Sequence, residues 1–117
     1  MNKTINMSFL NGFTGGETEK LKKYIKMFLQ GAPLLLDTMK QHLKDEKWED
    51  LKITAHTLKP QIAYMGISGL KDVLLNIEEL AEEHKNVGQL VALINQLDTT
   101  LQKAFNELQA ELDSISV

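Results

Sequence analysis

One histidine of this chain lies in a segment whose residue types and spacing could support nucleophilic chemistry. The segment, residues 55–66, reads AHTLKPQIAYMG and falls within a long helical pattern. On a helix drawn at about 100° per residue, His56 points roughly 180–260° away from the apolar stripe of this segment. That stripe consists of Leu51, Ala55, Leu58, Ile62 and Met65.

Small and cationic residues surround His56 on the same projection. Lys59, Ala63 and Gly66 lie within about 80° of it, so the histidine has a positive charge beside it and little bulk around it. A neutral imidazole placed in this way can act as a nucleophile. The pattern therefore predicts that His56 faces solvent and reacts with an anionic group.

A carboxylate in the next helical segment is expected to lie level with this histidine. If the turn of an antiparallel helical hairpin is centred at Ile67, residues at equal depth have numbers that sum to about 134, because each residue rises by ~1.5 Å. The level pairs are then His56 with Glu78, Lys52 with Glu82, and Glu49 with Lys85. Glu78 could accept the Nδ1 hydrogen and leave Nε2 free to attack. A solvated glutamate at the edge of its apolar stripe is the alternative interpretation.

The elements that must position these residues are all predicted to be helices, because apolar residues recur at helical spacing without sustained strand alternation. Thr14 and Glu17 have the spacing of a capping box, which predicts a helix that ends at Gly31, before Pro33 opens a second one. Three further helices are predicted, from about residue 45 to 66, from a cap at Ser68 to about 84, and over 87–112.

Short connections between long amphipathic helices favour antiparallel neighbours. We therefore expect an all-α fold, an antiparallel up-down four-helix bundle with an additional N-terminal helix. The 117 residues are enough for one domain, spanning 1–117, in which residues 1–16 are either linker-like or packed. Five helices can close a core alone, so the chain is expected to be a monomer.

Composition argues against several classes of function. The chain has no cysteine, which excludes disulfides, thiolate catalysis and zinc–cysteine sites. Its thirteen basic residues are all lysine and its net charge is −3, so we expect no nucleic-acid partner. No run has the length of a membrane span or the core of a signal peptide, so we expect a soluble cytoplasmic protein. No Walker-type motif is present, so ATP-dependent kinase activity is not expected.

The segment resembles the histidine-containing phosphotransfer (HPt) domains of phosphorelays. Their pattern is a helical His-x-x-Lys-Gly with a glycine ten residues after the histidine, and His56, Lys59 and Gly66 occupy those offsets here. Glu78 matches the family's frequent acidic or amide residue on the next helix, and the resemblance covers roughly residues 17–112. One departure is Pro60, which stands where the family usually has glycine. Because proline has no N–H for the carbonyl of His56, we expect a bent or loosened helix there.

The resemblance implies a phosphorelay intermediate in two-component signalling. A response-regulator receiver domain would bring an aspartyl phosphate with its Mg²⁺, and His56 would accept the phosphoryl group through Nε2 and pass it to another receiver aspartate. Lys59 would balance the phosphoryl charge and Glu78 would hold the ring, while the chain needs no cofactor or metal of its own. A hybrid sensor histidine kinase could be a further partner. The residues implied to meet the partner are Lys52, Pro60, Ala63 and Gly66.

Two other classes of function were compared with this interpretation. A di-iron bundle would need Glu-x-x-His motifs, but the residues three before the histidines are Met39, Ile53 and Ala81. A non-catalytic bundle that only binds a signalling partner would share the fold and stays an open alternative. Substitution of His56 separates that alternative from a relay, because only a relay would lose phosphate transfer.

Overall fold

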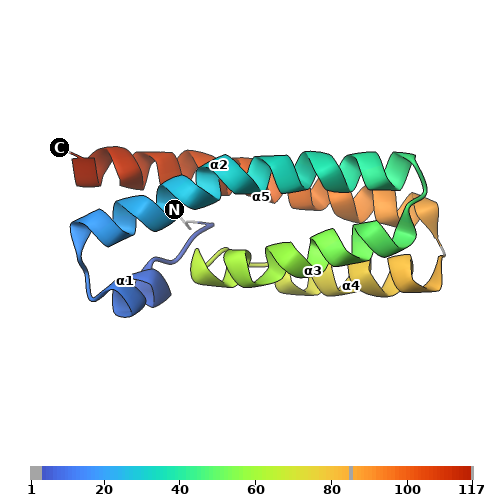
Figure 1. The fold of residues 1–117 in the computed structure, drawn as a ribbon, viewed down its shortest axis with the longest axis horizontal. Helices are drawn as coiled ribbons and strands as arrows, with labels where there is room; N and C mark the ends of the chain where they lie inside the picture. Colours follow the sequence, from blue (N-terminus) through green and yellow to red (C-terminus); the bar gives the residue numbers. More distant parts are fainter. Residues whose placement is uncertain (1–3, 85, 117) are drawn as a thin grey trace.

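The computed structural model describes residues 4–84 and 86–116, and these residues form helices joined by short connections. The helices are α1 (Ser8–Thr14), α2 (Thr18–Lys44), α3 (Trp48–Tyr64), α4 (Lys71–Glu83) and α5 (Val87–Ser116). Along the long axis, α2 runs in one direction, α3 returns, α4 reverses again and α5 comes back beside α2 (Figure 1). The predicted all-α bundle with an additional N-terminal helix is confirmed, although the additional helix is α1.

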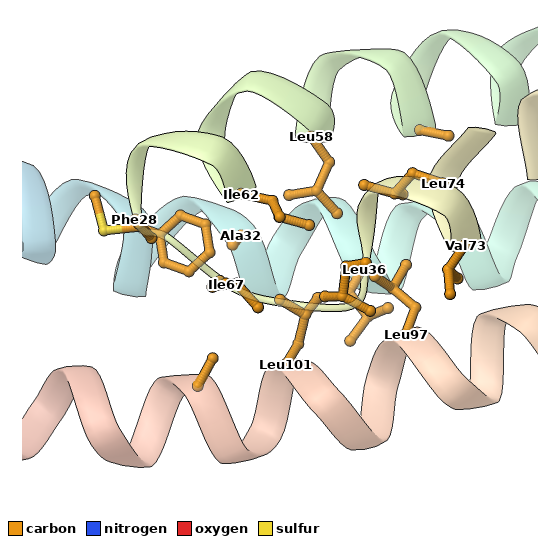
Figure 2. Packing of buried hydrophobic residues seen from close by; sticks show 14 of the residues in the cluster. Phe28, Ala32, Leu36, Leu58, Ile62, Ile67, Val73, Leu74, Leu97 and Leu101 are labelled. Carbon is orange, nitrogen blue, oxygen red and sulfur yellow. The ribbon is translucent and has the colours of Figure 1, made fainter. Parts of the chain in front are cut away.

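The bundle is held together by one apolar core that runs along its axis. Each of α2 to α5 contributes a stripe at spacings of three and four, and the stripes point into one shared core, to which α3, α4 and α5 contribute Leu58, Leu74 and Leu101 (Figure 2). These three side chains are fully buried. Because burial of a leucine contributes roughly 1.5–3 kcal/mol, this packing fixes how α3 and α4 lie against each other.

The predicted break between Gly31 and Pro33 is wrong, since α2 continues through both residues to Lys44. Pro33 removes one hydrogen bond, the one that an N–H at this position would donate to the carbonyl of Leu29. On either side of it, Phe28, Ala32 and Leu36 are buried in the core. Packing of this stripe therefore outweighs the local cost of the proline. In the same way, α3 remains helical through Pro60.

Both predicted caps are also wrong. Thr14 ends α1, and its hydroxyl donates to the carbonyl of Leu10 at 2.8 Å and does not cap α2, whose N-cap is Glu17. Ser68 does not cap α4, which begins at Lys71 after Leu70. The hydroxyls of Thr14 and Ser68 form other hydrogen bonds. Local sequence spacing alone does not show which acceptor such a hydroxyl will bond.

The N-terminal segment packs against the end of the bundle. The Asn6 N–H donates to the carbonyl of Gly66 at 2.9 Å, and the Ser68 N–H donates to the carbonyl of Thr4 at 3.0 Å. One carboxylate oxygen of Glu107 accepts from the Thr4 N–H at 2.8 Å. Within the described part of the chain, no helix is long and apolar enough to cross a membrane.

Gly66 allows this segment to approach the turn between α3 and α4. Its φ is 62°, in the left-handed region, and a Cβ placed on it would lie 1.9 Å from the carbonyl oxygen of Asn6. A side chain at this position would therefore be strained by its backbone and would collide with the N-terminal segment. Packing of the N-terminal segment therefore requires glycine at position 66, in addition to the partner contact that the sequence predicts there.

Candidate functional site

His56 and Glu78 face each other across the α3–α4 pair. The Nδ1 atom of His56 lies 2.9 Å from Oε1 of Glu78, and the imidazole is 72% exposed whereas the glutamate is 12% exposed. A carboxylate can only accept, so Nδ1 of the neutral ring carries the hydrogen and Nε2 keeps its lone pair. Glu78 is therefore a mostly buried partner of the ring and not a solvated residue.

The register that places this pair was predicted correctly from the sequence. Besides His56 with Glu78, Lys52 forms an ion pair with Glu82 one turn away. Of the third predicted pair, Glu49 with Lys85, the lysine lies outside the described residues. A tight turn and a constant rise per residue thus suffice to align two neighbouring helices.

The second oxygen of Glu78 is bound by Lys59. Its Nζ lies 2.9 Å from Oε2, and the lysine side chain is 27% exposed. One carboxylate therefore holds both the histidine and the neighbouring cation. An ammonium group has three donors, so two remain for an anion beside the ring.

Lys52 lies on the same side of α3 but is held by a different carboxylate. The hydrogen bond with Glu82 raises the pKa of Lys52, and the same bond lowers the pKa of Glu82. Both groups are therefore ionised around neutral pH. Lys52 contributes less net positive charge at His56 than the sequence alone indicates, because Glu82 offsets it.

Two hollows flank His56. A groove of about 610 Å³ lies between α3 and α4 toward their shared turn. Besides His56, Lys59 and Lys71, its lining is apolar or small: Pro60, Ile62, Ala63, Gly66, Ile67 and Leu74. A hollow of about 420 Å³ lies toward the other end of the helices, and the glutamates in its lining outnumber the lysines: Glu78, Glu79, Glu82 and Glu83 against Lys52 and Lys59. Three of the predicted partner-contacting residues, Pro60, Ala63 and Gly66, thus line one groove beside the ring.

The chain was compared with known proteins. The sequence model of the Hpt domain family matches residues 23–115, a range that includes His56, Lys59 and Glu78. This chain belongs to the Hpt domain family. Membership assigns it a phosphotransfer-related role in two-component signalling, in which Hpt domains generally interact with receiver domains.

One curated relative of this Hpt domain is a GTP 3′,8-cyclase from Sulfurimonas denitrificans, 38% identical over 88 residues. The match covers 64% of this chain and 27% of that protein, so the chain spans about a quarter of the relative's length. No solved structure matches the chain.

Sequence reasoning missed two features around the site of this Hpt domain. The bond from Lys59 to Glu78 was not foreseen, although residues 56 and 59 lie one turn apart and can reach a single carboxylate. The aromatic side chains that α1 places beside the end of α3 were also missed. The sequence signal for them is the pair Phe9 and Phe13 at a spacing of four.

In the part of the Hpt domain that the structure describes, no group of three or more metal-ligating side chains is positioned to hold a metal ion. His56 and Glu78 form a pair, and the other side chain at their contact is the cationic Lys59. The arrangement supports nucleophilic attack by an oriented imidazole beside a positive charge.

Proposed function

We propose that this Hpt domain is a phosphorelay intermediate, which accepts a phosphoryl group from a receiver aspartate onto His56 and passes it to another receiver aspartate. The observation that carries the proposal is the 2.9 Å contact between Nδ1 of the exposed His56 ring and the mostly buried Glu78 carboxylate. That contact fixes the tautomer in which Nε2 faces solvent with a free lone pair.

In the forward step, the Nε2 lone pair of neutral His56 forms a bond to phosphorus. The bond from phosphorus to the aspartyl oxygen breaks, and its electron pair leaves with the aspartate carboxylate. The ring becomes a phosphoimidazolium whose Nδ1–H still donates its hydrogen bond to Glu78, and the reverse sequence returns the group to a receiver. The protein contributes little covalent chemistry beyond the attacking nitrogen, so positioning and charge provide most of the acceleration of phosphoryl transfer.

Lys59 is proposed to balance the negative charge of the transferring group. Its Nζ is tied to Glu78 by one hydrogen bond, which keeps it beside the ring with two donors to spare. Lys52 is proposed to contribute less, because it is held by Glu82, whereas Lys59 is held by the same carboxylate that contacts the ring. Any Mg²⁺ that the transfer requires is expected in the receiver and not in this chain.

The groove beside His56 is proposed to receive the partner. Pro60, Ala63 and Gly66 are small residues, so a receiver can bring its aspartyl phosphate close to Nε2. The similarity to a GTP 3′,8-cyclase adds no second candidate function, because it covers only 27% of that protein.

The test is phosphoryl transfer from a panel of aspartyl-phosphorylated receiver domains to the wild type and to His56→Gln. We expect acid-labile, alkali-stable label on the wild type and none on the variant, with equal helicity by circular dichroism. His84→Gln is the matched control, since His84 is an exposed histidine at the end of α4. Equal label on His56→Gln, or no label on the wild type from any receiver, would refute the relay and leave a non-catalytic interaction module.

A further inference from the structure

The N-terminal part of the described chain fills a space that the α3–α4 hairpin does not reach. At ~1.5 Å per residue, the 27 residues of α2 and the 30 of α5 are about 40 and 45 Å long, whereas the 17 residues of α3 and the 13 of α4 span only about 25 and 20 Å. Residues 4–14, called the strap here, lie beside the start of α2 and the end of α5, which the hairpin leaves uncovered (Figure 1). The strap also lies outside residues 23–115, the range that the Hpt family model matches.

Backbone hydrogen bonds attach the strap to the turn between α3 and α4. The Asn6 N–H donates to the carbonyl of Gly66 at 2.9 Å, and the Ser68 N–H donates to the carbonyl of Thr4 at 3.0 Å. Water can satisfy all four of these main-chain groups once the strap is exposed, so breaking the two bonds leaves no group without a partner.

On α5, a single carboxylate holds the strap. One oxygen of Glu107 accepts from the Thr4 N–H at 2.8 Å and from the Ile5 N–H at 3.2 Å. Of the large apolar side chains of the strap, only Ile5 and Leu10 are buried. Few contacts therefore offset the conformational entropy that is lost when this segment is ordered, which is typical of the parts of a protein that open locally.

Two glycines join the strap to α2. Gly15 and Gly16 have φ values of 65° and 76°, and the space where a Cβ would lie is open at both. Glycine moves between the left-handed and right-handed backbone regions at little cost, so this connection can swing without strain. The core that α2 to α5 share is built mostly from residues outside the strap, so the bundle can stay folded when the strap moves away.

The strap and the groove beside His56 share one residue, Gly66. This glycine lines that groove, and it also lines another hollow, of about 770 Å³, together with Thr4, Asn6 and Ser68. While the strap is docked, Asn6 bonds the carbonyl of Gly66 and fills the space at its Cβ position. Release of the strap removes both constraints from the turn that bounds the groove.

We propose that the strap is releasable: it swings away about Gly15 and Gly16 while the bundle stays folded, and it thereby changes the groove beside His56 from a fixed to a mobile form. Glu107 controls the release, because one of its oxygens holds the first two amides of the strap. Release alters the groove whatever group reacts there, so it does not depend on the proposed relay.

The test is hydrogen exchange of the backbone amides of the full chain, measured by NMR at urea concentrations below the unfolding transition. The amides of Asn6 and Ser68 report the strap, and those of Leu58 and Leu101 report the bundle. We expect Asn6 and Ser68 to exchange together, at least tenfold faster than the bundle amides and at a rate that urea leaves unchanged, because a local opening exposes little surface. If they exchange at the rate of Leu58 and with the same urea dependence, the strap opens only by global unfolding and the proposal is wrong.

Glu107→Ala tests the control of release, with Lys103→Ala as the matched variant, which truncates an exposed side chain one turn earlier on α5. Because Glu107→Ala removes the acceptor of two N–H groups, we expect exchange of Asn6 and Ser68 to accelerate about tenfold or more, with Leu58 unchanged. Lys103→Ala should match the wild type. Equal acceleration in both variants, or an equal acceleration of Leu58, would remove Glu107 from this role.

A locked variant prevents the release. The two reciprocal backbone bonds flank Ile5 and Ile67, and residues flanked in this way are close enough for a disulfide. The chain has no cysteine of its own, so Ile5→Cys/Ile67→Cys introduces a single pair. Oxidation should slow exchange of Ser68 to the rate of Leu58, and reduction should restore it. Ser68 exchange that oxidation leaves unchanged would overturn the proposal, and a disulfide between two chains would show that the strap is exchanged between copies instead.

Discussion

Replacing Glu78 by alanine removes the acceptor of two hydrogen bonds at once, the one from Nδ1 of His56 and the one from Nζ of Lys59. A hydrogen bond that involves a charged group contributes about 1.5–3 kcal/mol. Because the imidazole is 72% exposed, water replaces part of the lost contact, so the lower end of that range applies. About 1.5 kcal/mol in the transition state corresponds to a roughly tenfold slower transfer.

The assay is single-turnover transfer from a phosphorylated receiver to His56, followed by rapid quenching. Glu79→Ala is the matched control, because it removes the neighbouring exposed carboxylate on α4 without touching the ring. Glu78→Gln separates the orientation of the ring from the charge of its partner. The amide oxygen can still accept the hydrogen bond from Nδ1, whereas the negative charge that pairs with Lys59 is lost. We expect Glu78→Gln to retain more of the rate than Glu78→Ala.

A transfer rate of Glu78→Ala within twofold of the wild-type rate, at unchanged helicity, would contradict this prediction. It also fails if Glu79→Ala slows transfer as much, because the effect would then be one of surface charge. A Glu78→Gln variant as slow as Glu78→Ala would show that the carboxylate charge that holds Lys59, and not the ring orientation, sets the rate.

Three further predictions concern stability. Gly66→Ala is expected to destabilise the fold by about 1–3 kcal/mol or more, because its φ of 62° disfavours a side chain and the Cβ would collide with Asn6. Gly31→Ala, within α2 and with open space at its Cβ position, should instead stabilise it by about 0.5–1 kcal/mol in urea denaturation. The hydrogen bond from Lys40 at 2.8 Å holds the pKa of Asp98 below its ordinary value, so this pair stabilises the fold above a pH of about 4 and loses its effect as the pH falls further. Lys40→Ala should therefore cost about 0.2–1 kcal/mol at pH 7 and less at pH 2, and an equal cost at both pH values would contradict the assignment.

The parts of this fold that could be predicted from the sequence are those that depend on periodicity and helix rise. Alignment of His56 with Glu78 needed only the position of the α3–α4 turn and the rise per residue. The apolar stripes likewise indicated which faces form the core. Both predictions used spacing within one hairpin, which distant parts of the chain do not alter.

The features that could not be predicted are those decided by contacts between distant segments. Pro33 is a strong local signal for a helix start, but burial of Phe28 and Leu36 on either side keeps α2 continuous. Ser68 has a suitable side chain for capping, but Thr4 lies within its reach and is bonded to it. The identity of a residue does not reveal which distant group it will meet.

The bond between Thr4 and Glu107 has a consequence for the order in which this domain folds. The two residues are 103 positions apart, whereas His56 and Glu78 are 22 apart. Closing the larger loop costs about 4 kcal/mol in chain entropy against roughly 2.7 kcal/mol for the smaller one. We therefore expect the α3–α4 hairpin to assemble early and the N-terminal segment to dock last. The histidine and its glutamate are thus expected to meet before the N-terminal segment reaches its place on the bundle.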